Sequence, residues 1–227
     1  MQWIHHYQLF LFDFDGLLVN TEFLHFQAYM RMCAKRNFLL NWSFERYSQI
    51  AHHSATGLSE QIYSYFPALY AQESRWEVLY EEKKQAFLEL IQEGSVQLMP
   101  GAQELLAQIK QAHIPCCVVT HSPLSLIQSI RKQLPVLNDI PYWITRENYS
   151  QPKPHSECYQ LAIKQLAKIG DRIIGFEDSP RGLKALLGTE ATPLLVCPPT
   201  YAYVKEERPK HVKYYSSLAA ITDANPP

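Results

Sequence analysis

The sequence predicts an α/β protein, with a mainly parallel sheet covered by helices on both faces and an inserted all-helical domain. Three observations predict this fold. Four short apolar runs end in polar residues or prolines, helical patterns lie between them, and residues 20–97 show helical periodicity without a convincing strand. Strands that alternate with helices pair in parallel through right-handed crossovers.

The four apolar runs have the length and composition of buried strands, and they lie at 8–12, 114–119, 172–176 and 193–197. Amphipathic patterns predict helices at 102–111, 124–134, 156–169 and 180–187. The carboxyl ends of parallel strands meet at one edge of the sheet, which is where open α/β sheets bind ligands. Polar residues that follow these strands are therefore candidates for a functional site.

The inserted stretch leaves the chain directly after the first strand and returns near Met99-Pro100-Gly101. We predict a core domain of residues 1–19 and 98–227 and an inserted domain of residues 20–97. The inserted domain is rich in aromatic residues, which we expect to form its core. A domain tethered by two linkers at the ligand-binding edge can act as a lid.

Composition excludes several classes of partner. The 227 residues include 21 basic and 22 acidic side chains, for a net charge of −1, without a long run of either sign. This balance gives no electrostatic footprint for nucleic acid or an anionic membrane, and the amino terminus resembles neither a signal peptide nor a membrane span. The five cysteines are odd in number and lack metal-ligand spacing, so we expect reduced core thiols in a cytoplasmic protein.

The strongest local motif is Asp13-Phe14-Asp15-Gly16, which places two carboxylates at the end of the first strand. Alone, it is equally compatible with a turn. The other strands or the loops after them supply Thr120, Lys153 and the pair Glu177-Asp178. Considered alone, Thr120 is typical of a helix cap, Lys153 of a solvated surface charge, and the Glu177-Asp178 pair of acids at a helix amino terminus. Together they supply the nucleophile, acid, hydroxyl, cation and metal ligands that phosphoryl transfer requires.

In these motifs the sequence resembles the haloacid dehalogenase superfamily, in its branch of phosphatases and β-phosphoglucomutase-like enzymes with a helical cap. The resemblance spans the chain from about residue 9 to about residue 196. It rests on the following segments in the family's order: Asp13 to Glu22, Val118 to Ser122, Lys153-Pro154, and Glu177-Asp178-Ser179 with Gly182 and Ala185. It implies a Rossmann-like core, with the inserted domain as the cap.

The resemblance implies four catalytic residues. Asp13 attacks the phosphorus of a phosphate monoester and forms an aspartyl-phosphate, while Asp15 is the general acid and base. The hydroxyl of Thr120 holds an oxygen of the transferring phosphoryl group, and Lys153 neutralises that group and holds Asp13. An acid at position 15 argues against cleavage of a carbon–halogen bond, because dehalogenases of this superfamily do not keep one there.

The resemblance also implies a Mg2+ cofactor and a set of substrate-binding residues. The expected metal ligands are Asp13, Asp15 through its backbone carbonyl, Glu177 and Asp178. The expected substrate-binding residues are Phe14, Gly16, His25 and His121. Of these, His25 resembles a histidine that couples cap closure to the acid/base aspartate in β-phosphoglucomutase-like members.

Three features depart from the family pattern or align with it poorly. His121 stands where a small residue or asparagine is more common, so its backbone N–H would bind phosphate there. Gln151-Pro152 stands where a glycine usually precedes the motif lysine. In the cap, the loop 51–57, with His52 and His53, is a candidate for reading the substrate, but the sequence does not identify that substrate.

The leading interpretation is a phosphatase that acts on a small phosphorylated metabolite, such as a sugar phosphate. A β-phosphoglucomutase-like phosphomutase is the alternative, because the same intermediate can pass its phosphoryl group to another hydroxyl. A catalytically silent binding protein with the same fold is a further alternative, although the complete set of motif residues argues against it. We expect a monomer or a weak dimer.

Overall fold

A computed structural model describes residues 1–53, 57–199, 201 and 208–227, and it divides into two compact units. Unit 1 comprises Met1–Asn20 and Gln97–Pro227, and unit 2 comprises Thr21–Val96. These limits differ by one residue at each junction from the domain boundaries expected from the sequence. The chain therefore crosses between the units twice, at residues 20–21 and 96–97.

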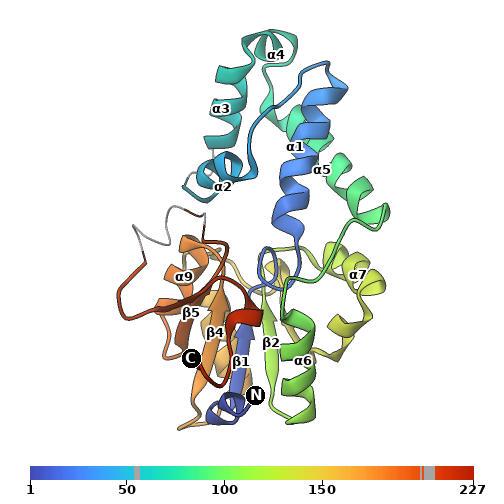
Figure 1. Ribbon diagram of the computed structural model, residues 1–227. Coiled ribbons are helices and arrows are strands. Elements are labelled where there is room, and N and C mark those ends of the chain that lie inside the picture. Colours follow the sequence, from blue (N-terminus) through green and yellow to red (C-terminus); the bar gives the residue numbers. More distant parts are fainter. Residues whose placement is uncertain (54–56, 200, 202–207) are drawn as a thin grey trace. The chain divides into compact units, whose positions relative to one another are not determined.

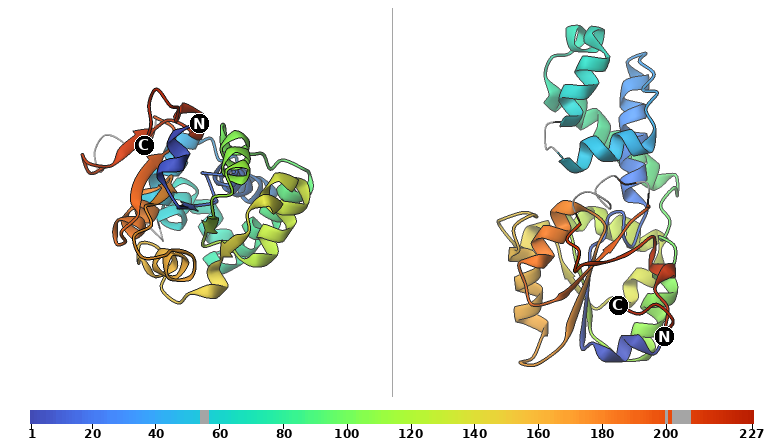
Figure 2. Two further views of the ribbon diagram at one scale, coloured as in Figure 1. Left: turned by 90° about the horizontal axis from the view of Figure 1, so that it is seen from below. Right: turned by 60° about the vertical axis from the view of Figure 1, so that its left-hand side comes forward.

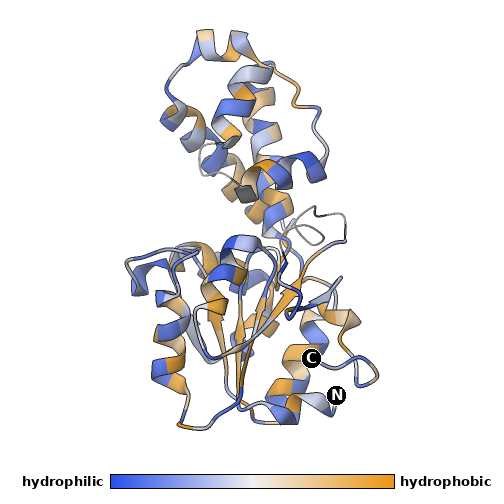
Figure 3. Cartoon of the chain, turned by 90° about the vertical axis from the view of Figure 1, so that its left-hand side faces the viewer, coloured by the Kyte–Doolittle hydropathy of each residue, from blue (hydrophilic) through white to orange (hydrophobic). Residues whose placement is uncertain are grey.

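The described part of unit 1 contains a six-stranded sheet in the order β3-β2-β1-β4-β5-β6, and every pair of neighbours is parallel (Figure 1). The strands are β1 (Leu9–Phe12), β2 (Cys116–Val119), β3 (Tyr142–Ile144), β4 (Ile173–Glu177), β5 (Thr192–Val196) and β6 (Lys213–Tyr215). The fold prediction is confirmed. The strands contain the most hydrophobic segments of the unit (Figure 3).

The helices of unit 1 lie on both faces of the sheet, with α6 and α8 on opposite sides (Figure 2). They are α6 (Ala102–Gln111), α7 (Leu124–Gln133), α8 (Glu157–Leu166) and α9 (Pro180–Leu187), with short 3-10 turns η1 (Trp3–His6), η2 (Pro135–Asp139), η3 (Arg146–Asn148) and η4 (Leu218–Ala220). From β1 the chain moves outward to β3, and it then returns to β4 on the other side of β1. The strand order thus reverses between β1 and β4, where doubly wound sheets place their ligands.

Side chains of β1 alternate between the two faces of the sheet. Leu9 and Leu11 belong to the hydrophobic cluster that includes Tyr159 of α8. Phe10 and Phe12 point to the other face, where the ring of Phe12 stacks on that of Phe176 at 4.8 Å. All four β1 side chains are fully buried, so burial on both faces fixes this strand at the centre of the sheet.

Two of the six strands were not expected from the sequence. Both β3 and β6 have three residues and lie at the edges of the sheet, and each has an exposed, an intermediate and a buried position in turn. Tyr142 at the start of β3 is 46% exposed. A short, half-exposed edge strand lacks the continuous apolar run that identified the four central strands.

Unit 2 is helical throughout its described secondary structure. Its helices are α1 (Thr21–Lys35), α2 (Phe44–His53), α3 (Gly57–Tyr65), α4 (Pro67–Gln72) and α5 (Trp76–Gln92), and α1 packs along α5. Its core includes Phe26, Tyr29 and Tyr47, as expected for an aromatic-rich domain. Tyr65 and Tyr70 are instead 41% and 54% exposed, so the aromatic residues are only partly core.

Part of the candidate substrate loop lies outside the described residues. This holds for residues 54–56 and for the side chains of His52 and His53, so the structure does not bear on that expectation. All five cysteines are buried and free of disulfide bonds. Among the described helices, none has the length and apolarity needed to cross a bilayer.

Candidate active site

The motif that follows β1 forms a tight loop at the carboxyl edge of the sheet. The backbone N–H of Asp13 donates to the carbonyl of Phe176, which ties the start of the loop to β4. Gly16 has a φ of 80°, a conformation that glycine adopts without the steric cost of a side chain. The ring of Phe14 is fully buried and makes an edge contact with Trp143. Any contribution of Phe14 to substrate binding would therefore come from its backbone.

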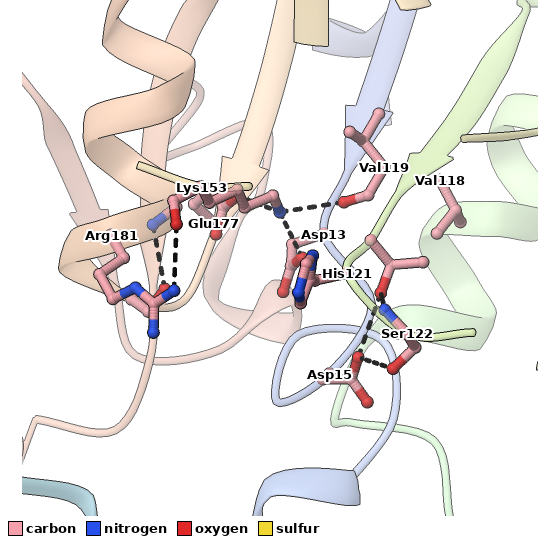
Figure 4. A network of polar contacts seen from close by, with 12 residues as sticks. Asp13, Asp15, Val118, Val119, His121, Ser122, Lys153, Glu177 and Arg181 are labelled. Atoms are coloured by element: carbon pink, nitrogen blue, oxygen red, sulfur yellow. Dashed lines mark hydrogen bonds and ion pairs between the residues drawn. The ribbon is translucent and has the colours of Figure 1, made fainter. Parts of the chain in front are cut away.

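Lys153 is the centre of a buried polar network (Figure 4). Its Nζ donates to Oδ1 of Asp13 at 2.6 Å and to Oε1 of Glu177 at 2.6 Å. It also lies 3.0 Å from the carbonyl of Val119 and 3.2 Å from the hydroxyl of Tyr159. Lys153 is only 8% exposed, so the interpretation of this lysine as a solvated surface charge is wrong.

Two hydroxyl groups hold the side chain of Asp15. Oδ2 of Asp15 accepts hydrogen bonds from Oγ1 of Thr120 at 3.1 Å and from Oγ of Ser122 at 2.7 Å. The backbone N–H of Ser122 donates to Oγ1 of Thr120, which fixes the two hydroxyls relative to each other. Ser122 was not among the residues predicted for the site. Its position, two residues after Thr120 on the same polar loop, was the available signal.

In the part of the chain that the structure describes, one cluster of three carboxylates has the composition of a metal site. Asp13, Glu177 and Asp178 each offer one oxygen, all within 4.8 Å of one another, and all three residues are buried. Oε2 of Glu177 is buried without a hydrogen-bond partner. Carboxylate oxygens are the ligands that hard divalent cations such as Mg2+ prefer, so the residues fit such an ion. The Asp15 side chain is not part of this group, which leaves its backbone carbonyl as the predicted ligand.

The charges of this network shift the pKa values of its members. Burial raises the pKa of Asp13 to about 8, and Glu177 and Asp15 act in the same direction while Lys153 opposes them. Burial alone would lower the pKa of Lys153, but Asp13 and Glu177 together raise it above its usual value. A single cation is thus shared between two buried carboxylates. The remaining negative charge favours a second cation at this place.

His121 lies beside the network, on the exposed side of the loop that follows β2. Its Nδ1 is 3.0 Å from the hydroxyl of Tyr149, which donates to the carbonyl of Thr120. Burial lowers the pKa of His121, and the nearby cations Arg146 and Arg181 lower it further. At neutral pH the imidazole is therefore uncharged.

The start of α9 closes the site behind Glu177. Ser179 caps this helix by accepting a hydrogen bond from the N–H of Gly182 at 3.2 Å. A Cβ atom at Gly182 would overlap the carboxylate of Glu177, so a larger residue there would force that buried carboxylate to move. Arg181 donates from Nη2 to the carbonyl of Lys153 at 3.0 Å, which holds the backbone of the lysine (Figure 4). This contact of Arg181 was not predicted from the sequence.

His25 belongs to unit 2, and its predicted coupling to Asp15 of unit 1 stays a prediction. Within unit 2, Nζ of Lys83 lies 2.7 Å from Nδ1 of His25, and the His25 ring stacks on Phe87 at 4.0 Å. Burial and the charge of Lys83 lower the pKa of His25 to about 3. The imidazole is therefore neutral and accepts a hydrogen bond from the Lys83 ammonium group.

The chain is similar to known proteins over most of its length. A family model described as haloacid dehalogenase-like hydrolase matches residues 10–191. Protein CbbY of Cereibacter sphaeroides is 27% identical over 183 residues, which cover 78% of this chain and 79% of that protein. The phosphorylated carbohydrates phosphatase of Thermotoga maritima is 27% identical over 180 residues, which cover 77% and 78% of the two chains.

The fold is also similar to that of solved structures. The crystal structure of CbbY from Rhodobacter sphaeroides in complex with phosphate superposes with a TM-score of 0.70 at 23% sequence identity. The match covers 94% of this chain and 95% of that one. At this level of identity the similarity establishes a shared fold.

Proposed function

Because this chain belongs to the haloacid dehalogenase-like hydrolases, we propose that it is a Mg2+-dependent phosphatase that forms an aspartyl-phosphate on Asp13. The observation that carries the proposal is the position of Lys153. Its ammonium group donates a hydrogen bond to Asp13, and Asp13 belongs to the cluster of three carboxylates that fits a metal ion. A nucleophile, a cation and metal ligands meet in one buried cluster. These are the components that phosphoryl transfer to a carboxylate needs.

In the proposed mechanism, Asp13 attacks the phosphorus of a monoester and displaces the leaving alkoxide. Lys153 offsets negative charge on Asp13 and on the incoming phosphoryl group. Asp13 and Asp178, with the backbone carbonyl of Asp15, would hold Mg2+, which supplies charge neutralisation for the attack of one anion on another. Water then hydrolyses the aspartyl-phosphate and releases inorganic phosphate.

Asp15 is the proposed general acid for the leaving group and the general base for the water. The hydrogen bonds from Thr120 and Ser122 to Oδ2 of Asp15 support this role, because a proton-transfer group needs a fixed orientation. Residues 20–97 are the proposed cap, which would shield the intermediate from bulk solvent.

The proposed substrate is a small phosphorylated metabolite, with phosphorylated sugars as the first class to test. The name of the Thermotoga maritima relative supports this choice, since that protein is described as a phosphatase of phosphorylated carbohydrates. The five buried free cysteines support a cytoplasmic location, where thiols stay reduced.

The proposal is tested by measuring phosphate release from a panel of phosphorylated metabolites with Mg2+, with and without glucose 1,6-bisphosphate. A phosphatase releases phosphate at a rate set by the monoester alone. A phosphomutase instead converts its substrate without net release and needs the bisphosphate. If no monoester releases phosphate under any of these conditions, the phosphatase proposal fails, and a phosphomutase or a binding role remains.

A further inference from the structure

Tyr159 lies on α8, and its side chain is completely buried beneath the site. Its hydroxyl donates to Oε1 of Glu177 and lies 3.2 Å from Nζ of Lys153. The same Nζ is 4.9 Å from the centroid of the tyrosine ring. One side chain thus contacts both the buried lysine and its buried counterion, yet the mechanism above gives it no role.

We propose that Tyr159 is a positioning residue whose hydroxyl holds Glu177, so that Lys153 remains directed at Asp13 and the phosphoryl group. This inference rests on the proposed phosphatase function. It assigns Glu177 a second role besides that of a candidate metal ligand, namely counterion to the lysine.

Asp13 and Glu177 compete for the ammonium group of Lys153. Nζ of Lys153 lies 2.6 Å from a carboxylate oxygen of Asp13 and 2.6 Å from one of Glu177. The two carboxylates attract the same cation, but only Asp13 is the proposed nucleophile. A hydrogen bond from Tyr159 to Oε1 of Glu177 offsets part of the charge on that oxygen. Glu177 then attracts the Lys153 ammonium group less strongly, and Lys153 keeps its hydrogen bond to Asp13.

Lys153 has fewer N–H donors than neighbouring oxygen atoms. An ammonium group has three N–H donors, and Lys153 has four oxygen atoms within 3.2 Å. The Tyr159 hydroxyl is the most distant of them. The Tyr159 hydroxyl donates its proton to Glu177, so Tyr159 affects Lys153 mainly through the Glu177 carboxylate.

The Tyr159 side chain is held in a rigid environment. The Tyr159 ring packs in the hydrophobic cluster that joins α8 to β1 and β2, together with Leu11, Cys117 and Val119. This packing fixes the ring, so its hydroxyl reaches a defined point. A buried hydroxyl in that position acts as a fixed support for the groups that touch the substrate.

The experiment compares Tyr159→Phe with Tyr215→Phe. Tyr215 is a matched control, because it is 3% exposed and its hydroxyl donates to the carbonyl of Pro226 at 2.8 Å, remote from the site residues in the network. We expect Tyr159→Phe to lower kcat about tenfold and to raise the inhibition constant of inorganic phosphate several-fold, with Mg2+ saturating. We expect Tyr215→Phe to change only the thermal unfolding temperature.

A double-mutant cycle with Glu177→Gln separates positioning from general stability. If Tyr159 acts through the charge of Glu177, removing the hydroxyl has a much smaller effect on kcat in the Glu177→Gln background than in the wild type. Equal effects in the two backgrounds, or a Tyr159→Phe variant with the kcat and phosphate inhibition of the wild type, would overturn the inference. A wild-type protein without phosphatase activity would instead contradict the proposed function.

Discussion

The hydroxyl of Ser122 lies 2.7 Å from Oδ2 of Asp15, which makes it the shorter of the two side-chain hydrogen bonds that this carboxylate accepts from hydroxyls. Both donors come from the loop after β2, whereas Asp15 comes from the loop after β1. The proposed acid/base group is therefore oriented by a neighbouring strand of the same sheet.

Replacing this serine tests whether that orientation matters for turnover. We expect Ser122→Ala to lower kcat about tenfold, because Asp15 loses a hydrogen bond and gains rotational freedom. Ser129→Ala is the matched control, since the Ser129 hydroxyl donates to the carbonyl of Ser125 on the exposed side of α7. Steady-state kinetics on both variants give the result. Equal kcat values would mean that the Ser122 contact has no catalytic role.

The metal-free protein should lose stability as the pH rises. Burial raises the pKa of Asp13 to about 8 from its usual value of 3.8. The folded state therefore binds more protons than the unfolded state between these values, and its free energy of unfolding falls as the pH rises through this window, by at most about 1.4 kcal/mol per pH unit. Thermal unfolding in the presence of a chelator, from about pH 5 to about pH 8, measures this slope.

Added Mg2+ should reverse the trend, because the ion binds the ionised carboxylate. We expect a larger increase in unfolding temperature from Mg2+ at about pH 8 than at about pH 5. The Asp13→Asn variant should show a flatter pH dependence in the absence of metal. If its unfolding temperatures follow the wild type at every pH, Asp13 is not the group that titrates.

The proposed magnesium ligand Asp178 gives a separate prediction. We expect Asp178→Asn to raise the Mg2+ concentration needed for half-maximal activity at least tenfold, as an approximate lower bound for the loss of a charged ligand. Asp139→Asn is the control, because Asp139 forms an exposed ion pair with Lys110. An unchanged Mg2+ dependence in Asp178→Asn would remove this residue from the metal site.

Gly182 tests the packing behind Glu177. An alanine at an ordinary helical position is favoured over glycine by about 1 kcal/mol. Here the added methyl group would overlap the Glu177 carboxylate. We therefore expect Gly182→Ala to destabilise the fold by about 2 kcal/mol, with loss of activity, as measured by denaturant unfolding. Lys184→Ala, an exposed position of the same helix, is the control, and a Gly182→Ala variant as stable as the wild type would contradict the account.

The central strands and the site edge were predictable from the sequence because each rests on a local pattern. Continuous apolar runs identify strands that are buried on both faces, and polar residues directly after them mark the ligand-binding edge. Asp13 and Lys153 are separated by 140 positions in the chain, and the expectation that they meet came from the resemblance to the haloacid dehalogenase superfamily, because Lys153 follows β3 and none of the predicted strands. The edge strands β3 and β6 lack such runs, so they were missed.

The supporting residues of the site could not be predicted in the same way. Tyr159 reads in the sequence as one more apolar residue on the inner face of α8, and only its packing brings the hydroxyl to Glu177. Lys83 reads as one charge among several on α5, yet it is 4% exposed and contacts His25. In both cases a polar group is partnered with a residue of a different helix or strand, and the local sequence pattern does not indicate that contact.

The claim that Asp13 is the nucleophile is tested most directly by stopping the enzyme with acid during turnover of its best monoester and locating the phosphoryl group by peptide mass spectrometry. We predict one phosphoryl group on Asp13 in the wild type, and neither a phosphorylated peptide nor turnover in Asp13→Asn. Turnover of Asp13→Asn at the wild-type rate, or a phosphoryl group on a different residue, would contradict the account.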